Sequence, residues 1–145
     1  MKKAVLTGVV ALMTFGIAFA QTGTEELPQV SLEYIKQHYP SEQITFVEKD
    51  NDFLSWNNND MYEVHFSSGL ELNFNKAGEI TEIDAPKDQV IPAGLLPQAI
   101  VSYVENNYSG VGINSWELDG NDQDVELANG IDLEFDKNGN FRKVD

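Results

Sequence analysis

Two segments of the chain carry apolar residues at the spacing of an α-helix. In residues 27–39 and 96–108 an apolar side chain recurs every three or four positions, which is typical of a helix with one buried face. Pro28 and Pro97 suit the first turns. The residues expected on the two buried faces are Leu27, Val30, Tyr34, Ile35, His38, Tyr39, Leu96, Ala99, Ile100, Tyr103, Val104 and Tyr108. We therefore predict two amphipathic helices whose tyrosines pack in a core.

After each helix the apolar residues alternate with polar ones, which is the pattern of half-buried β-strands. The first helix is followed by predicted strands at 44–49, 61–66, 70–74 and 80–83, and the second by strands at 113–118, 125–127, 131–135 and 141–144. The chain therefore reads as a helix and four strands, repeated once, which predicts an α+β fold.

The two halves also align residue by residue. Residues 27–39 match 96–108 with an offset of 69 positions, and residues 62–84 match 123–145 with an offset of 61. The difference of eight residues falls in the loop between the first two strands of the first copy. Self-similarity of this kind indicates one duplicated unit rather than two unrelated domains.

The alternation also predicts which residues lie opposite each other in the hairpins. If the apolar side chains share one face, three-residue loops that end in glycine must connect the strands, with a left-handed glycine as the last loop residue. The predicted opposite pairs are Phe66 with Leu70, Phe74 with Ile80, Leu127 with Ile131, and Phe135 with Phe141. Ile83 and Val144 fall one position out of phase, so we expect a bulge or a strand end there.

Polar residues occupy the other face of the predicted sheet. They are Glu63, His65, Glu71 and Asn73 in the first copy and Asp124, Glu126, Asp132 and Glu134 in the second. The register places Glu126 opposite Asp132 and Asp124 opposite Glu134, and like charges in opposite positions destabilise a sheet. Two interpretations remain open: a solvated face of an acidic protein, or a surface that binds a cationic partner.

A second candidate contact region is the loop at residues 50–60. It places Phe53 and Trp56 among Asn and Asp residues. Exposed aromatic side chains are costly, and Trp is a common anchor residue of protein interfaces, although such a side chain can also fold back onto its own domain. We predict Trp56, with Phe53, as partner contacts.

The N-terminus and the composition point to an exported acidic protein. Residues 1–20 have two lysines, an apolar stretch and a final Ala-Phe-Ala, which is typical of a signal peptide cleaved after Ala20. The chain has 24 acidic residues, nine Lys and Arg, a net charge of −15 and no cysteine. This charge argues against binding to nucleic acid and favours basic proteins, peptides or metal ions. No second apolar stretch reaches the length of a membrane span.

Catalytic and metal motifs are incomplete. The chain has no thiol and no serine elbow motif, and its two histidines, His38 and His65, fall on different predicted elements. The acidic loop at residues 119–130 lacks the glycine and the final glutamate of a calcium-binding loop. We predict no catalytic residue, no cofactor and no dedicated metal site.

The repeated segments resemble a known family. The Leu-Pro-Gln at the head of each helix, the Tyr at its end, and residues 64–80 (VHFSSGLELNFNKAGEI) and 125–141 (VELANGIDLEFDKNGNF) resemble the PepSY-like, beta-lactamase-inhibitor-like family of small exported bacterial proteins. The resemblance implies one curved antiparallel sheet with both helices on its convex face, and a periplasmic location. It supplies no catalytic residue. The inhibitor of this fold is disulfide-bonded, and this chain has no cysteine, so inhibition does not transfer with the resemblance.

These observations define two functional hypotheses. Residues 21–145 would form one domain of two repeats, about 27–84 and 96–145, that binds a basic protein or peptide without catalysis, as an inhibitor of a secreted enzyme in one version. The alternative is a surface of the cell envelope that responds to cations such as calcium. The oligomeric state is left open.

Overall fold

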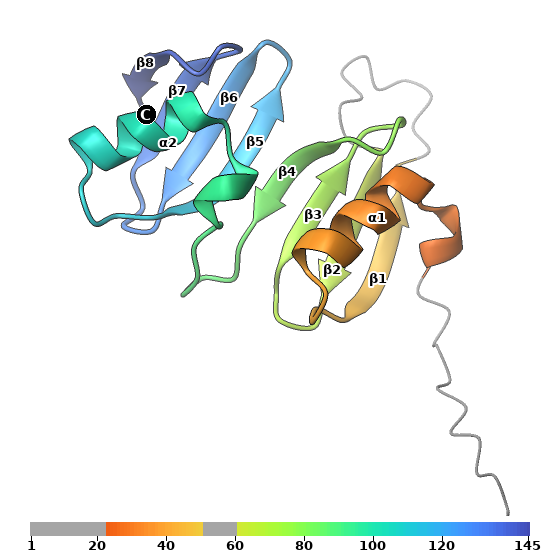
Figure 1. Ribbon diagram of the computed structural model, residues 1–145. Helices are drawn as coiled ribbons and strands as arrows, with labels where there is room; N and C mark the ends of the chain where they lie inside the picture. The colour runs from red at the N-terminus through yellow and green to blue at the C-terminus, as the bar shows by residue number, and fades with distance from the viewer. Residues whose placement is uncertain (1–22, 51–60) are drawn as a thin grey trace, which may run out of the picture.

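The computed structural model describes residues 23–50 and 61–145. Its strands form one antiparallel sheet of eight, in the order of the sequence, and both α-helices lie on the same face of it (Figure 1). The helix and four strands expected from the sequence occur twice. The strands are β1 (Ile44–Lys49), β2 (Tyr62–Phe66), β3 (Glu71–Phe74), β4 (Ile80–Asp84), β5 (Ile113–Asp119), β6 (Asp122–Leu127), β7 (Asp132–Asp136) and β8 (Phe141–Val144).

The helices begin slightly later than predicted. Helix α1 (Gln29–His38) follows a short 3-10 helix, η1 (Thr24–Glu26), and α2 (Gln98–Asn107) follows η2 (Ala93–Leu95). Pro28 and Pro97 have extended backbones, with ψ of 146° and 127°. Each proline therefore caps its helix from outside rather than occupying its first turn.

The predicted register is confirmed in all four hairpins. The amide of Phe66 donates to the carbonyl of Leu70, and the amide of Leu127 donates to that of Ile131. Phe74 lies opposite Ile80, and Phe135 opposite Phe141, and in both cases the pairing then shifts by one residue, as a β-bulge does. The predicted irregularity before Ile83 and Val144 is therefore a bulge.

One apolar row crosses the sheet under the helices. Each member lies opposite the next, and we call the set the core row: Val47, Val64, Leu72, Ile83, Trp116, Val125, Leu133 and Val144. Ile83 and Trp116 join the two repeats. The indole of Trp116 donates to the side-chain oxygen of Gln123 at 3.0 Å, and the Gln123 amide donates to the carbonyl of Asp136. The buried indole nitrogen of Trp116 and the buried side-chain amide of Gln123 thus both have hydrogen-bond partners.

Each helix starts directly above a turn glycine. Gly78 and Gly139 have φ of 87° and 79°, and a Cβ on either would lie 2.8 Å from the Cβ of Pro28 or of Ala99. Such a contact is too close, so only glycine permits the helices to approach the turns.

This close approach corrects the predicted helix faces. Val30 is 55% exposed and Ala99 is also exposed, whereas Ser31 is fully buried. The Ser31 hydroxyl donates to the carbonyl of Gly78 at 3.2 Å. The buried face of α1 therefore takes in Ser31 in place of Val30, and this polar residue can enter the core because a turn carbonyl accepts its hydrogen bond.

The predicted packing of the tyrosines is confirmed. Tyr34 lies edge-on to Phe74 with ring centroids 5.9 Å apart, and Tyr103 lies edge-on to Phe135 at 5.4 Å. Burial raises the pKa of Tyr34 to about 12. These rings fill the space between helix and sheet in both repeats.

The packing predicts a large effect at the centre of the second repeat. Phe135 is fully buried, so Phe135→Ala should lower the free energy of unfolding by about 3–5 kcal/mol because it leaves a cavity. Val30→Ala, at the exposed helix position, should change it by less than about 0.5 kcal/mol. Urea denaturation of both variants measures the difference. Similar losses for the two would contradict this description of the core.

Candidate functional site

The sheet face away from the helices carries two polar rows. In each row every residue lies opposite the next on the neighbouring strand, and together they form what we call the open face. The long row crosses all eight strands and consists of Glu48, Glu63, Asn73, Glu82, Glu117, Asp124, Glu134 and Lys143. The short row consists of Phe46, His65, Glu71, Asp84, Ser115, Glu126 and Asp132.

The two rows arise from the alternation of the strands. When the core row points to the helices, the residues on either side of it along each strand must point the other way. Because the eight strands form one sheet, these residues line up across both repeats. A pattern that is local in each strand therefore becomes a surface as wide as the sheet.

The structure brings together every described site residue named from the sequence. These are Glu63, His65, Glu71, Asp124, Glu126, Asp132 and Glu134, which all lie in the two rows. Their role as partner contacts stays a prediction. Phe53 and Trp56 lie outside the described residues.

Four further carboxylates complete the open face and were missed in the sequence. They are Glu48, Glu82, Asp84 and Glu117, on β1, β4 and β5. The alternation in the outer strands of each copy could have indicated them. Their alignment with the other acids depends on the pairing of β4 with β5, which no hairpin turn specifies.

Burial and neighbouring negative charges both act on two carboxylates of this face. Burial, followed by the negative charges of Glu134 and other nearby acids, raises the pKa of Asp124 above its ordinary value of 3.8. The pKa of Asp84 is raised by burial and then by Glu71 and Glu126. Asp84 and Glu126 belong to different repeats, so the negative potential is continuous across their junction.

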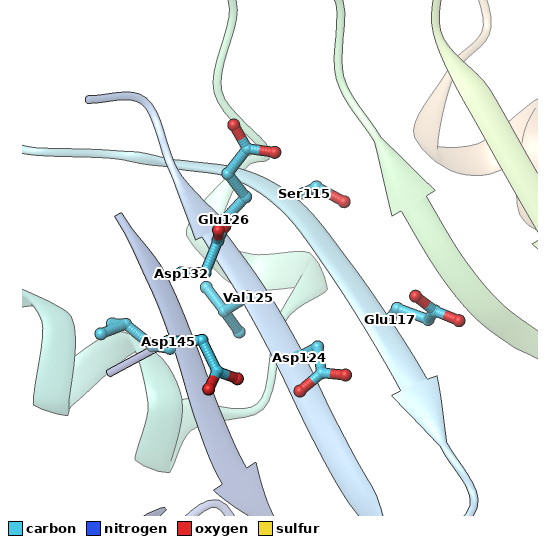
Figure 2. Close-up of a pocket in the computed structure, with 8 residues that line it drawn as sticks. Ser115, Glu117, Asp124, Val125, Glu126, Asp132 and Asp145 are labelled. Atoms are coloured by element: carbon cyan, nitrogen blue, oxygen red, sulfur yellow. The ribbon is translucent and has the colours of Figure 1, made fainter. Parts of the chain in front are cut away.

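The open face is hollowed in both repeats. A depression of about 330 Å³ in the second repeat is lined by carboxylates of β5, β6 and β7, including Glu117, Asp124 and Glu126, and their side chains stand on the exposed side of the strands (Figure 2). A second depression, of about 360 Å³, is lined by residues that include Glu48, Glu63 and Asn73. Carboxylates of neighbouring strands line the first, and the lining of the second also includes Lys49.

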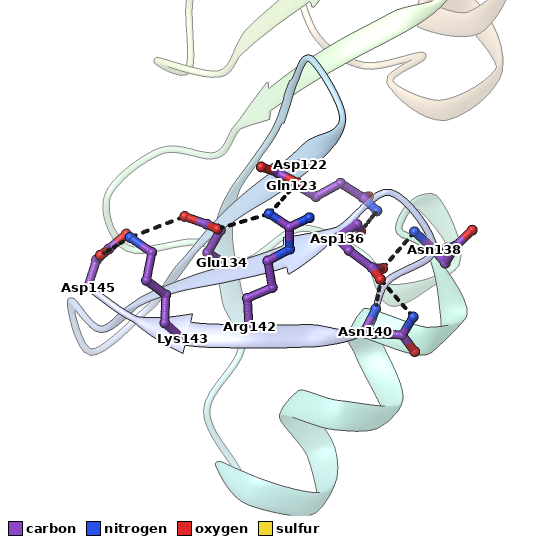
Figure 3. Close-up of polar contacts among 9 residues, drawn as sticks. All are labelled: Asp122, Gln123, Glu134, Asp136, Asn138, Asn140, Arg142, Lys143 and Asp145. Carbon is purple, nitrogen blue, oxygen red and sulfur yellow. Dashed lines mark hydrogen bonds and ion pairs between the residues drawn. The ribbon is translucent and has the colours of Figure 1, made fainter.

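Basic side chains meet the open face near its β8 edge, and Lys49 lines the second depression. Arg142 lies 2.8 Å from Asp122 and 3.6 Å from Glu134, and Lys143 lies 3.2 Å from Glu134 (Figure 3). The hydrogen bonds that the Lys143 ammonium donates to Asp145 and Glu134 raise the pKa of Lys143.

His65 is the one residue of the two rows that can supply a nitrogen ligand. Its Nε2 lies 3.2 Å from a carboxylate oxygen of Glu63, and its Nδ1 lies 3.1 Å from one of Glu71. The ring also stacks on Phe46 with centroids 5.7 Å apart. Glu48, Glu63 and His65 each offer a ligand atom within 4.8 Å of the others. These residues could hold a divalent ion, a site that the sequence prediction of no metal site did not include.

One further observation concerns the membrane. Among the described residues, no helix combines the length and the apolar character that a bilayer span requires.

Comparisons with known proteins agree on the family and the fold. A family model described as "Putative beta-lactamase-inhibitor-like, PepSY-like" matches residues 20–57 and 60–143. No curated protein matches the chain. The solved structures include a "putative calcium-regulated periplasmic protein" from Bacteroides thetaiotaomicron, with 32% identity and a TM-score of 0.74 over 84% of this chain and 92% of that one.

Two structures from Bacteroides vulgatus are equally similar. Both are described as periplasmic, with 32% and 31% identity and TM-scores of 0.75 and 0.72, and each match covers 84% of this chain. They cover 92% and 94% of those chains. The sequence match over nearly the whole described chain, together with the eight-stranded sheet under two helices, shows that this chain belongs to the PepSY-like family.

Proposed function

We propose that the protein is a non-enzymatic binding protein of the periplasm whose open face holds a basic protein or peptide. The observation that carries the proposal is the array of acids that extends across both repeats, in which Glu82 lies opposite Glu117, Asp124 opposite Glu134 and Glu126 opposite Asp132. The raised pKa values of Asp84 and Asp124 agree with it. A solvated face needs charge, but it does not need charges aligned opposite one another at a cost in stability. A cationic partner would convert this repulsion into attraction.

The chemistry of the face suggests how binding would work. A partner that presents Lys or Arg side chains would place them in the two depressions, between carboxylates of neighbouring strands. The wide negative field would accelerate the encounter, and salt would weaken it. An exported enzyme with a basic surface fits this description, and the family description as inhibitor-like supports testing enzymes first.

Two observations support a periplasmic location. The similar structures are described as periplasmic, and residues 1–20 have the pattern of a signal peptide. Cleavage after Ala20 is part of the proposal, and mass spectrometry of the mature protein from the native envelope tests it.

The stability lost through like charges on the open face can be measured first. Asp124→Asn should increase stability at neutral pH by up to about 1 kcal/mol, because it removes a charge opposite Glu117 and Glu134. The pKa of Asp124 is raised in the fold, so the penalty is present above that pKa. It disappears as the pH falls toward 3.8, the ordinary value. Denaturation at several pH values should therefore show the gain shrinking on acidification.

Asp136→Asn is the matched control for this charge change. The Asp136 side chain accepts hydrogen bonds from the side-chain amide of Asn140 and from the backbone amides of Asn140 and Asn138, and these bonds hold its pKa low. The equivalent residue in the first repeat is Asn75, which makes the same two backbone contacts. This variant should not gain stability at neutral pH. An equal gain in both variants would mean that only net charge matters.

Binding is tested by reversing charge in the middle of the open face. Affinity capture from envelope extract with the wild-type protein should enrich a basic protein that Glu126→Lys with Asp132→Lys no longer retains. Both positions are exposed and face like charges, so the variant should remain folded. Glu105→Lys on α2, an exposed helix position, should retain the partner. Trp56→Ala separately tests the loop contact.

The purified partner then gives the decisive measurement. Its affinity should fall by tenfold or more when salt is raised from about 50 to 200 mM, if several ion pairs form. Capture that is equal for the open-face and the α2 variants would contradict the proposal. If the partner is an enzyme, its activity with and without the bound protein shows whether binding inhibits it.

A second candidate function is supported by the cluster of Glu48, Glu63 and His65. A similar structure is described as calcium-regulated, and divalent ions would relieve the same repulsion as a basic partner. The repeat equivalents are Glu117, Asp124 and Glu126, which offer oxygen ligands alone. Calcium prefers oxygen ligands, whereas zinc accepts imidazole nitrogen. The two repeats would therefore select different ions.

Calorimetric titration with calcium chloride and zinc chloride separates these cases. His65→Ala should reduce zinc binding at least tenfold and leave calcium binding unchanged, and Glu126→Gln should do the reverse. His38→Ala, on helix α1, serves as the control because it removes the other histidine of the chain. Weak uptake that moderate salt abolishes equally in all variants would show diffuse screening and would dispose of this candidate.

A further inference from the structure

The strands at the two edges of the sheet, β1 and β8, occupy the same places in their repeats as β5 and β4, the strands that join the two halves. The offset of 69 carries β1 onto β5, and the offset of 61 carries β4 onto β8. Inside the chain, β4 and β5 pair directly and hold the repeats together. The molecule therefore ends, at both edges, in copies of the strands that already pair at its centre.

The equivalence fixes a register for contact between two molecules. At the internal junction, Glu82 lies opposite Glu117, Ile83 opposite Trp116, and Asp84 opposite Ser115. The equivalent residues on β8 and β1, taken in the same order, are Lys143 with Glu48, Val144 with Val47, and Asp145 with Phe46. We propose that β8 of one molecule pairs antiparallel with β1 of a second copy in this register, which extends the sheet from head to tail.

The charges at the two edges fit this contact better than those at the internal junction. The junction tolerates Glu82 opposite Glu117, whereas the edges would bring Lys143 opposite Glu48. Lys143 is the only basic member of the long row. That row thus begins with an acid on β1 and ends with a base on β8, so the two ends are complementary.

The apolar surface at the edges fits as well. Val144 closes the core row at β8 and is 53% exposed, and Phe46 on β1 is 52% exposed. These are two of the four large apolar side chains that are exposed among the described residues. Pairing would set Val144 against Val47, in the way that Ile83 lies against Trp116, and would continue the apolar row into the next molecule.

Other features limit the strength of the contact. At the internal junction the side-chain amide of Asn114 also donates to the carbonyls of Ala85, Pro86 and Gln89. Thr45 is its equivalent on β1, and its hydroxyl donates within its own repeat, to the carbonyl of His65. The net charge of −15 adds long-range repulsion between copies, which is screened at physiological ionic strength, where the Debye length is about 8 Å. Association should therefore be weak and concentration-dependent.

The geometry also specifies the shape of the assembly. The contact joins different surfaces of the two copies, so each added molecule exposes another free edge. The products should be linear oligomers and not a closed dimer. Sedimentation velocity and small-angle scattering of the mature protein, up to about 1 mM, should show a mean mass and length that rise together with concentration.

Charge exchange tests the register. Lys143→Glu and Glu48→Lys should each weaken association at least tenfold, because like charges then face each other. The double variant E48K/K143E restores an opposite pair with an unchanged net charge and should associate like the wild type. Lys137→Glu, in an exposed turn, is the control for net charge alone. Equal weakening by Lys137→Glu and Lys143→Glu, or a failure of the double variant to recover, would overturn the proposal.

A covalent readout gives an independent check. The chain contains no cysteine, so Val47→Cys combined with Val144→Cys reports this edge contact alone. Mild oxidation should give a ladder of disulfide-linked oligomers. The control pair of Val30→Cys and Val144→Cys joins an exposed helix position to the same edge and should give no ladder. Monomers at every concentration, or equal ladders from both pairs, would refute head-to-tail pairing.

Discussion

The architecture depends on the burial of one face of a continuous sheet. The core row must be covered by α1 and α2, and in a strand the neighbours of an inward residue point outward. Covering the core row therefore commits both flanking rows to solvent at the same time. The acidic open face is the direct complement of the hydrophobic core, and a change of one position in register would exchange the two.

Duplication extends the acidic open face beyond the four strands that one repeat could supply. The contact of Ile83 with Trp116 joins two four-stranded units into one sheet. It also brings Asp84 of one unit within the electrostatic influence of Glu126 of the other. The continuity of the negative field across both repeats follows from this single junction, whereas each depression lies within one repeat.

The divergence of the repeats gives each half its own chemistry. His65 in the first repeat corresponds to Glu126 in the second, and Glu82 on β4 corresponds to Lys143 on β8. Because of the first replacement, the cluster of Glu48, Glu63 and His65 offers nitrogen and oxygen ligands, whereas its equivalent in the second repeat offers oxygen ligands alone. The second gives the two ends of the long row opposite charge. The backbone is common to both repeats, so differences in function must come from such positions.

The sequence alone determined the elements, their order and the hairpin registers, because these depend on local alternation and on loop glycines. It also placed six of the acids, together with His65 and Asn73, on one face of the strands. Only the tertiary structure decided that Ser31 and Gln123 are buried. Each of these polar side chains depends on a hydrogen-bond partner distant in sequence. The pairing of β4 with β5, and with it the continuous open face, was likewise undetermined, because no turn specifies which edges meet.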